Sequence, residues 1–275
     1  MKPKFRLTVM TAFLAVAAAG CFIVPAAAAG TLKIIDNELV PGNTAVSYMG
    51  ITVNSVSDKD GPRVVVKRWG FKLLDIPVEA HPERLEGMLK FGFVKLLGPF
   101  FGKQLVIMSY SGGAHCCTDY RVYTLGFGLK EIFRTYRWNT GYELSYGDIN
   151  GDGRTELVQP SLCFDYFRAP HSESVIQDVI FNYSLKAGEF VPSKTPLDYI
   201  KTTARDYASP MSKALVKLLP FLYNGDEKKA RETFEAVYDE KDKDTARKEL
   251  AGRISGDPVC VYLNQGVLPQ KVEEK

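Results

Sequence analysis

Histidine, cysteine and tryptophan are scarce in this sequence, with three, five and two copies among 275 residues. It contains no phosphate-binding loop, no dinucleotide-binding glycine pattern and no His-Glu-x-x-His motif, which removes three common classes of enzyme. No Cys-x-x-Cys pair is present, which argues against a zinc site. Two of the histidines, His81 and His171, lie beside prolines and are expected in loops.

The sequence also has little excess charge. It holds 35 lysines and arginines against 32 aspartates and glutamates. Lys2, Lys4 and Arg6 belong to a leading segment that we expect to be removed, which leaves 32 basic and 32 acidic residues. A balanced chain argues against a nucleic-acid partner, and against an anionic-membrane binder as the default interpretation.

Only one long apolar run is present, at residues 7–24. Basic residues precede it, and Pro25 with the small residues 26–29 follow it. This order is typical of a secretory signal peptide, so we expect cleavage after Ala29 and a periplasmic or secreted protein. A retained membrane anchor is the alternative.

The apolar run contains a second signal. Ala18-Ala19-Gly20-Cys21 resembles a bacterial lipobox, in which the cysteine is acylated and becomes the new N-terminus. By that resemblance the protein would be a lipoprotein anchored through Cys21, and only then would a membrane be a partner.

Residues 30–192 are predicted to form a β-rich domain. Short runs rich in Val, Ile, Tyr and Phe alternate with Gly, Asn and Asp, which is typical of strands and turns. The predicted strands are 32–35, 46–53, 63–67, 105–110, 121–125, 131–136, 156–159 and 179–185. One helix is predicted at 82–92, with Pro82 in its first turn, Leu85, Met88 and Leu89 on its apolar face and Gly92 at its end.

Residues 193–275 have helical spacing and are predicted to form a small C-terminal helical region. The two helical stretches are 198–222 and 226–254, separated by Asn224-Gly225, with Asp226 as an N-cap. The charge run 239–244 is expected to be a solvated loop, and Asp244 or Thr245 is expected to cap a third helix. The fold class is therefore α+β: a β-rich domain, either an incomplete propeller or a sandwich, followed by helices.

The strongest chemical signal is the acidic loop 148–156. Asp148, Asn150 and Asp152 place side-chain oxygens at alternate positions, and Gly153 permits a sharp turn. The Arg154 carbonyl and the Glu156 side chain can complete a shell of oxygens, which is what calcium prefers. An EF-hand is not expected, because its twelfth position is Gln159 here and a strand-like run follows the loop.

The loop resembles the calcium loops of FG-GAP and VCBS-type repeats, which form blades of β-propellers in integrin α chains and in secreted bacterial proteins. By this resemblance the calcium ligands are Asp148, Asn150, Asp152, Arg154 through its carbonyl, and Glu156. The match covers about twelve residues and one copy. The alternative is a hairpin turn rich in Asp and Asn that holds no metal.

A second segment, Ser-Gly-Gly-Ala-His-Cys-Cys at 111–117, resembles one found in secreted bacterial proteins of uncharacterised function that also carry such a loop. Four cysteines remain after cleavage, an even number that predicts disulfides in an exported chain. Cys116 and Cys117 can each pair with one of Cys163 and Cys260, or they can form a vicinal bridge that leaves Cys163 to pair with Cys260.

The sequence therefore predicts an exported, calcium-binding, disulfide-stabilised binding or scaffold module, with an envelope protein or a glycan as its partner. Aromatic residues crowd the acidic loop, which is compatible with sugar stacking but also with an ordinary core. The alternative is an extracytoplasmic hydrolase of envelope polymers that uses His115 and nearby carboxylates. Whether the protein is an enzyme stays open at this point.

Overall fold

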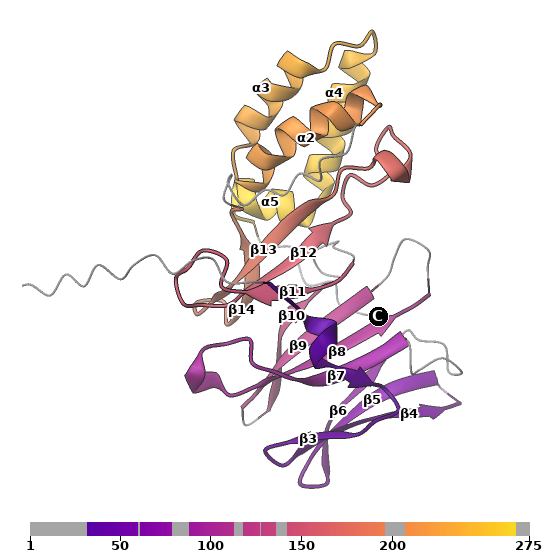
Figure 1. Ribbon diagram of the computed structural model, residues 1–275, viewed down its shortest axis with the longest axis vertical. Helices are drawn as coiled ribbons and strands as arrows, with labels where there is room; N and C mark the ends of the chain where they lie inside the picture. The colour runs from indigo at the N-terminus through magenta and orange to yellow at the C-terminus, as the bar shows by residue number, and fades with distance from the viewer. Residues whose placement is uncertain are drawn as a thin grey trace, which may run out of the picture.

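The computed structural model describes residues 32–59, 61–78, 88–112, 118–126, 128–135, 142–195 and 207–267. Within these ranges the chain forms three antiparallel sheets, followed by four helices (Figure 1). The predicted α+β class, with a β-rich part followed by a helical part, is confirmed. The signal-peptide segment and residues 113–117 lie outside the described ranges.

Three successive meanders build the β-rich part. Sheet C has the order β3 (Val46–Tyr48), β4 (Ile51–Asp58), β5 (Gly61–Arg68), β6 (Phe71–Pro77). Sheet B has the order β10 (Leu129–Arg134), β9 (Thr118–Leu125), β8 (Gln104–Tyr110), β7 (Leu89–Val94), β2 (Val40–Pro41). Sheet A has the order β1 (Lys33–Ile34), β11 (Ser145–Gly147), β12 (Glu156–Ser161), β13 (Gln177–Ser184), β14 (Glu189–Ser193).

Each sheet contains four strands in chain order, and the two short N-terminal strands complete two of the sheets. β2 pairs with β7, and β1 pairs with β11. Three short 3-10 helices, η1 (Ile35–Glu38), η3 (Pro99–Phe101) and η5 (His171–Glu173), lie in the connections. Consecutive four-stranded meanders are the repeating unit of a propeller, but a closed ring usually needs four or more. The described part of the chain is thus an open stack of three sheets.

Sheet B is the middle layer of this stack. Its central strand β8 is buried on both faces, since all residues from Gln104 to Ser109 are buried. Leu105 and Ile107 belong to the core shared with sheet C, whereas Val106 and Met108 belong to the core shared with sheet A and the helices. The alternation of side chains along a strand therefore divides β8 between two cores.

The contact between sheets A and B is rich in aromatic rings. Phe133 of β10 meets Phe181 of β13 edge-on at a centroid distance of 5.0 Å and Phe190 of β14 at 6.3 Å. All three rings are fully buried. Edge-to-face pairs of this kind add stability beyond the burial of their area.

Four helices follow the last strand: α2 (Pro210–Tyr223), α3 (Glu227–Val237), α4 (Lys243–Gly256) and α5 (Pro258–Gln265). They lie at the end of the molecule opposite sheet C (Figure 1). The buried face of α2, including Leu215, Leu218 and Leu222, shares the core of sheets A and B. None of the described helices has both the length and the hydropathy needed to cross a membrane.

The predicted cap of the second helix is confirmed. Asp226 accepts a hydrogen bond from the backbone N–H of Lys229 at 3.0 Å, as an N-cap does. Gly225 before it has a φ of 78°, a left-handed conformation that favours glycine. The third helix, α4, instead has Asp242 at its N-cap, so the prediction of Asp244 or Thr245 is wrong.

Of the described part of the predicted helix 82–92, only Met88 is helical, because Leu89–Val94 is the strand β7, so the prediction is wrong for residues 89–92. Gly92, expected to end the helix, lies inside this strand with its α-carbon close to η1, and a Cβ there would come within 2.9 Å of the Glu38 carbonyl oxygen. Residues 79–87 lie outside the described ranges. The predicted strand 46–53 is divided by a turn at Met49-Gly50, and β2, β6, β11, β14 and α5 were not predicted.

Replacing Phe133 with alanine should lower the free energy of unfolding by about 3–5 kcal/mol, because the ring fills the contact between two sheets. Phe100→Ala is the matched control, since that ring is 96% exposed, and it should change stability by less than about 0.5 kcal/mol. Chemical denaturation of both variants measures the difference. Equal losses would contradict the stacked-sheet core.

Candidate functional site

The acidic loop 148–156 connects β11 to β12 in sheet A, and Gly147 pairs with Glu156 at its base. Asp148 Oδ1 accepts hydrogen bonds from the N–H groups of Gly151 at 2.8 Å and Asp152 at 3.1 Å. Its Oδ2 accepts from the N–H of Gly153 at 2.9 Å. The carboxylate of Asp148 therefore lies inside the turn, and Gly153, with a φ of 81°, takes the conformation that the sequence predicted for it.

The next two polar side chains continue this pattern. Asn150 Oδ1 accepts from the N–H of Asp152 at 2.9 Å, and Asp152 Oδ1 accepts from the N–H of Arg154 at 2.8 Å. The Asn150 amide also donates to Asp152 Oδ2 at 3.3 Å. Such Asx turns fold the backbone tightly around its own side-chain oxygens.

Glu156 is the buried member of the loop, with 2% of its surface exposed. Its Oε2 accepts from the N–H of Ile149 at 2.8 Å. Burial raises the pKa of the Glu156 carboxyl above its ordinary value, and the negative charges of Asp152 and Asp148 raise it further against the lowering effect of the backbone N–H groups. The charges of Asp148 and Asp152 thus oppose the ionisation of Glu156.

The loop fits calcium in the type and the order of its oxygens. Asp148 Oδ2 and Asp152 Oδ1 each accept one hydrogen bond in the structure, and a carboxylate oxygen has room for a further contact. Within the described ranges, however, no three His, Cys, Asp or Glu side chains converge into a metal-binding group. The loop contains the residue types that bind calcium, but their side chains do not converge on a common point in the structure. Calcium binding therefore stays a prediction.

His115, Cys116 and Cys117 lie outside the described residues. Asp119, the next carboxylate along the chain, is described. It faces two arginines, with Arg121 Nε at 2.8 Å and Arg134 Nε at 3.5 Å. A carboxylate held between two guanidinium groups is suited to a structural ion pair, and the hydrolase alternative gains no support from it.

Cys163 and Cys260 are free, buried thiols in the structure. They belong to one polar cluster between sheet A and the helices, in which Cys260 Sγ lies 3.3 Å from Asp257 Oδ2. The Tyr223 hydroxyl donates to Asp257 Oδ2 at 3.1 Å and lies 3.0 Å from Ser161 Oγ. Burial raises the pKa of both thiols, and the Asp257 carboxylate raises it further.

This cluster connects three elements that are distant in the sequence. Ser161 ends β12, Tyr223 ends α2, and Asp257 caps α5 through its bond to the N–H of Val259 at 2.8 Å. Sequence reasoning found the two cysteines but missed Tyr223 and Asp257. The pair Asp257-Pro258, an N-cap followed by proline, was the local signal that could have revealed both the cap and α5.

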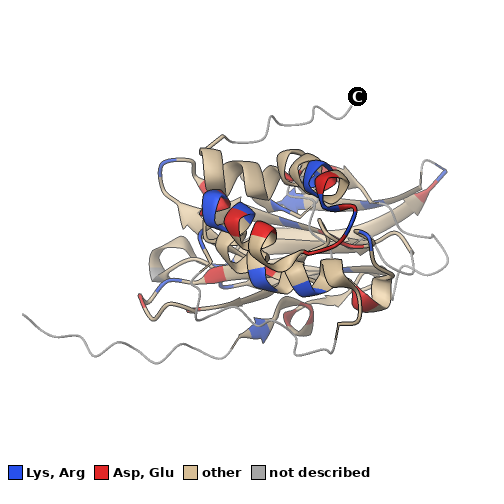
Figure 2. Cartoon of the chain, turned by 90° about the horizontal axis from the view of Figure 1, so that it is seen from above, with Lys and Arg blue, Asp and Glu red and all other residues tan. Residues whose placement is uncertain are grey.

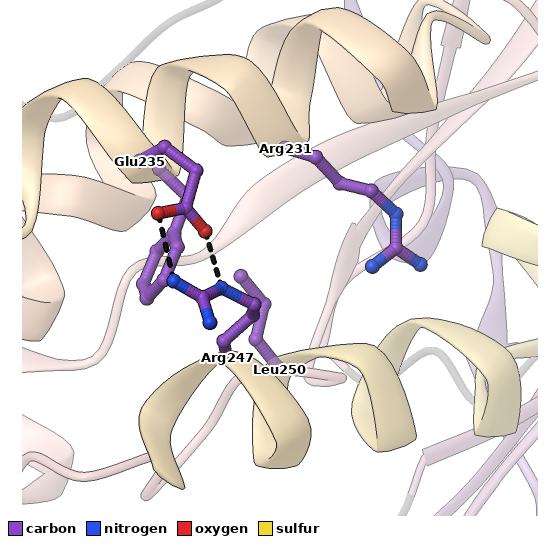
Figure 3. A pocket seen from close by; sticks show the side chains of 5 residues that line it. Arg231, Glu235, Arg247 and Leu250 are labelled. Atoms are coloured by element: carbon purple, nitrogen blue, oxygen red, sulfur yellow. Dashed lines mark hydrogen bonds and ion pairs between the residues drawn. The ribbon is translucent and has the colours of Figure 1, made fainter. Parts of the chain in front are cut away.

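A pocket of about 150 Å³ lies between α3 and α4, and it is lined by Arg231, Phe234, Glu235, Arg247 and Leu250 (Figure 3). Arg247 closes it with two hydrogen bonds to Glu235, at 2.5 and 2.9 Å. Figure 2 shows the wider context, in which acidic and basic residues are interspersed along the helices. The pocket is smaller than typical ligand sites of about 300–1,000 Å³, and its charges are paired.

Comparison with known proteins returns no match among family models, curated proteins or solved structures. The resemblance to FG-GAP and VCBS repeats therefore depends on the loop sequence, and it stays a prediction. The disulfides likewise stay a prediction.

Replacing Glu156 with glutamine, with calcium chelated, should raise the free energy of unfolding at pH 7 by on the order of 1 kcal/mol. Glutamine keeps an acceptor for the N–H of Ile149 and removes the buried charge. Because the folded-state pKa of Glu156 lies above its unfolded value, the wild-type protein loses stability as the pH rises between the two values. The advantage of the variant should therefore shrink on acidification.

Denaturant titrations at several pH values between 4 and 7 measure this effect. Glu240→Gln is the control, since Glu240 is exposed in the loop before α4, and it should leave the pH profile unchanged. A variant that is less stable than the wild type at pH 7 under chelation would contradict the assigned repulsion.

Proposed function

We propose that this protein is an exported calcium-binding scaffold or binding module of the bacterial envelope. The observation that supports it is the buried Glu156 carboxylate beside Asp148 and Asp152, whose mutual repulsion a divalent cation would relieve. The leading segment, with its basic start, apolar run and small residues, supports export.

In this proposal calcium has a structural role. The ligands would be Asp148, Asn150, Asp152, the Arg154 carbonyl and Glu156. When bound, the ion supplies the positive charge that the loop lacks. The chain itself provides the turn, since Asp148 already holds the N–H groups of residues 151–153, and this turn fixes β11 against β12.

The position of the loop gives the ion an effect beyond the turn. β12 leads directly to Ser161 and Cys163, which lie in the polar cluster under the helices. A loop that fixes the start of β12 therefore also supports the end of the same strand, where Ser161 contacts the helical region through Tyr223. This is the expected behaviour of a scaffold whose surface is ordered by its metal.

The thermal unfolding temperature should rise with free calcium, because a ligand bound only by the folded state stabilises it by mass action. At a hundredfold excess over the Kd the gain is about 2.7 kcal/mol. Asp152→Asn keeps the oxygen that accepts from the N–H of Arg154 and removes one negative charge, so it should weaken the response. Asp239→Asn is the matched control, because Asp239 is exposed in the loop between α3 and α4.

Glu156→Gln gives the sharpest form of this test. It should be more stable than the wild type in chelator and less stabilised by calcium, so the two melting curves change order across the titration. If calcium does not change the unfolding temperature of the wild type, the loop is a turn that binds no metal, and the proposal is contradicted.

We also propose that Cys163 pairs with Cys260 in the exported protein. Both thiols lie in the cluster around Asp257, and each is close enough to interact electrostatically with it. Their oxidation gives up two electrons and two protons to a disulfide donor of the envelope. Of the possible pairings, this one leaves Cys116 and Cys117 to a vicinal bridge.

Peptide mapping by mass spectrometry without reductant should find Cys163 linked to Cys260. The bridge closes a loop of almost 100 residues, so reduction should lower the free energy of unfolding by about 3–5 kcal/mol. The double variant Cys163→Ser/Cys260→Ser should lose the part of the reductant effect that this bridge causes, and only a change from the Cys116–Cys117 bridge should remain. A linkage of either residue to Cys116 or Cys117 would overturn this pairing.

A further inference from the structure

Sheet C carries two hairpin turns that expose large apolar side chains. Met49 lies in the turn between β3 and β4, and Trp69 in the turn between β5 and β6, followed by Phe71 at the start of β6. These three side chains are 75%, 78% and 76% exposed. The two turns touch, since the Trp69 N–H donates to the Gly50 carbonyl oxygen at 3.0 Å. We refer to Met49, Trp69 and Phe71 as the apolar tip.

The backbone of both turns is unusual for such residues. Met49 and Trp69 have φ values of 49° and 50°, and the glycines that follow have 76° and 89°. A two-residue turn with positive φ at both positions favours Asn-Gly or Asp-Gly, because bulky side chains are disfavoured in the left-handed region. The chain thus places large apolar groups where neither burial nor turn geometry requires them.

Basic residues surround the tip. Lys67 of β5 lies directly opposite Lys72 of β6, an arrangement of like charges that destabilises a sheet. Lys72 is partly compensated by Asp75 at 3.0 Å. Arg68 lies over the Trp69 ring at 5.9 Å. Residues 46–53 and 66–74 contain these three cations and no acidic residue.

A neighbouring loop repeats this combination of exposed aromatic and cation. In the connection from β7 to β8, Phe100 is 96% exposed, and Lys103 lies over the Tyr48 ring at 5.8 Å. Tyr48 is the residue before Met49. The loop therefore adds aromatic and basic groups beside the first turn.

We infer that the apolar tip docks on an anionic lipid surface, with Met49, Trp69 and Phe71 at the headgroup boundary and Lys67 and Lys72 facing the lipid phosphates. Tryptophan is preferred at membrane interfaces, and basic side chains bind anionic headgroups. This contact goes beyond the proposed calcium function, and it requires neither the loop 148–156 nor acylation of Cys21.

The shape of the surface favours lipid over a protein or a sugar. The two turns protrude from sheet C at the end of the molecule opposite the helices (Figure 1). A protruding apolar point with a basic surround suits insertion into an interface, in which the apolar groups enter and the cations stay at the phosphates. The local cationic charge is compatible with the balanced charge of the whole chain.

The test uses the full chain with vesicles of phosphatidylethanolamine and phosphatidylglycerol at 3:1, and with vesicles of phosphatidylcholine alone. Brominated acyl chains in the vesicles should quench the fluorescence of Trp69, strongly in the anionic vesicles and weakly in the neutral ones. Trp69→Asn leaves Trp138 as the remaining tryptophan, so loss of quenching in this variant assigns the signal to the tip. Because this readout is local, vesicle binding by the apolar run 7–24 does not imitate it.

Two sets of variants separate docking from folding. Met49→Asn/Trp69→Asn suits the turns better, so it should keep or raise the unfolding temperature while vesicle sedimentation weakens at least tenfold. Leu185→Asn, an equally exposed apolar residue in the turn between β13 and β14, is its control and should bind normally. Lys67→Gln/Lys72→Gln should weaken binding roughly fivefold for each lysine, and Lys228→Gln/Lys241→Gln on the helical region should not.

The measurements are made in chelator and in calcium, so that the result does not depend on the calcium proposal. Absence of Trp69 quenching, equal quenching in neutral and anionic vesicles, or a large fall in the unfolding temperature of the asparagine variant would overturn the inference. A Trp69 fluorescence response to soluble peptidoglycan fragments, with none to vesicles, would assign the tip to a sugar and would also overturn it.

Discussion

The burial of sheet B on both faces is the constraint on which the rest of the structure depends. One face of β8 and its neighbours packs on sheet C, and the other packs on sheet A and the helices. Apolar area removed from water on two sides of one sheet provides most of the driving force for joining the three layers. Both candidate surfaces are outside this layer: the acidic loop belongs to sheet A and the apolar tip to sheet C.

The two surfaces differ in how the chain departs from ordinary packing. In the acidic loop, a carboxylate is buried beside two others, which opposes stability through charge. At the tip, apolar rings are exposed in a strained turn above a pair of facing lysines. A bound cation would neutralise the buried charge of the acidic loop. An anionic lipid interface would accommodate the exposed apolar side chains and the lysines of the apolar tip.

Local sequence patterns predicted much of the architecture, and the elements that they missed have physical explanations. Strands with β-branched runs, such as β5 and β8, were found because alternation and turn residues bracket them. The strand β7 was missed because the helical spacing of Leu85, Met88 and Leu89 extended the predicted helix as far as Gly92, whereas the burial of β7 and the close approach of Gly92 to Glu38 favour a strand. In the acidic loop, residue type and spacing predicted the tight turn, but the burial of Glu156 depends on the sheet around it. The cluster of Tyr223, Asp257 and the two cysteines could not be predicted, since it is assembled by packing of distant elements.

The pairing of the two N-terminal strands has a consequence for the order in which the chain folds. Val40 pairs with Phe91, and Lys33 pairs with Tyr146, so the first described residues find their partners about 50 and 110 positions later. Contacts with such separation form late, because the intervening chain must be ordered first. The strands β2 and β1 therefore stay unpaired until β7 and β11 are in place. The first described strands are thus expected to join their sheets only after the strands that receive them have formed.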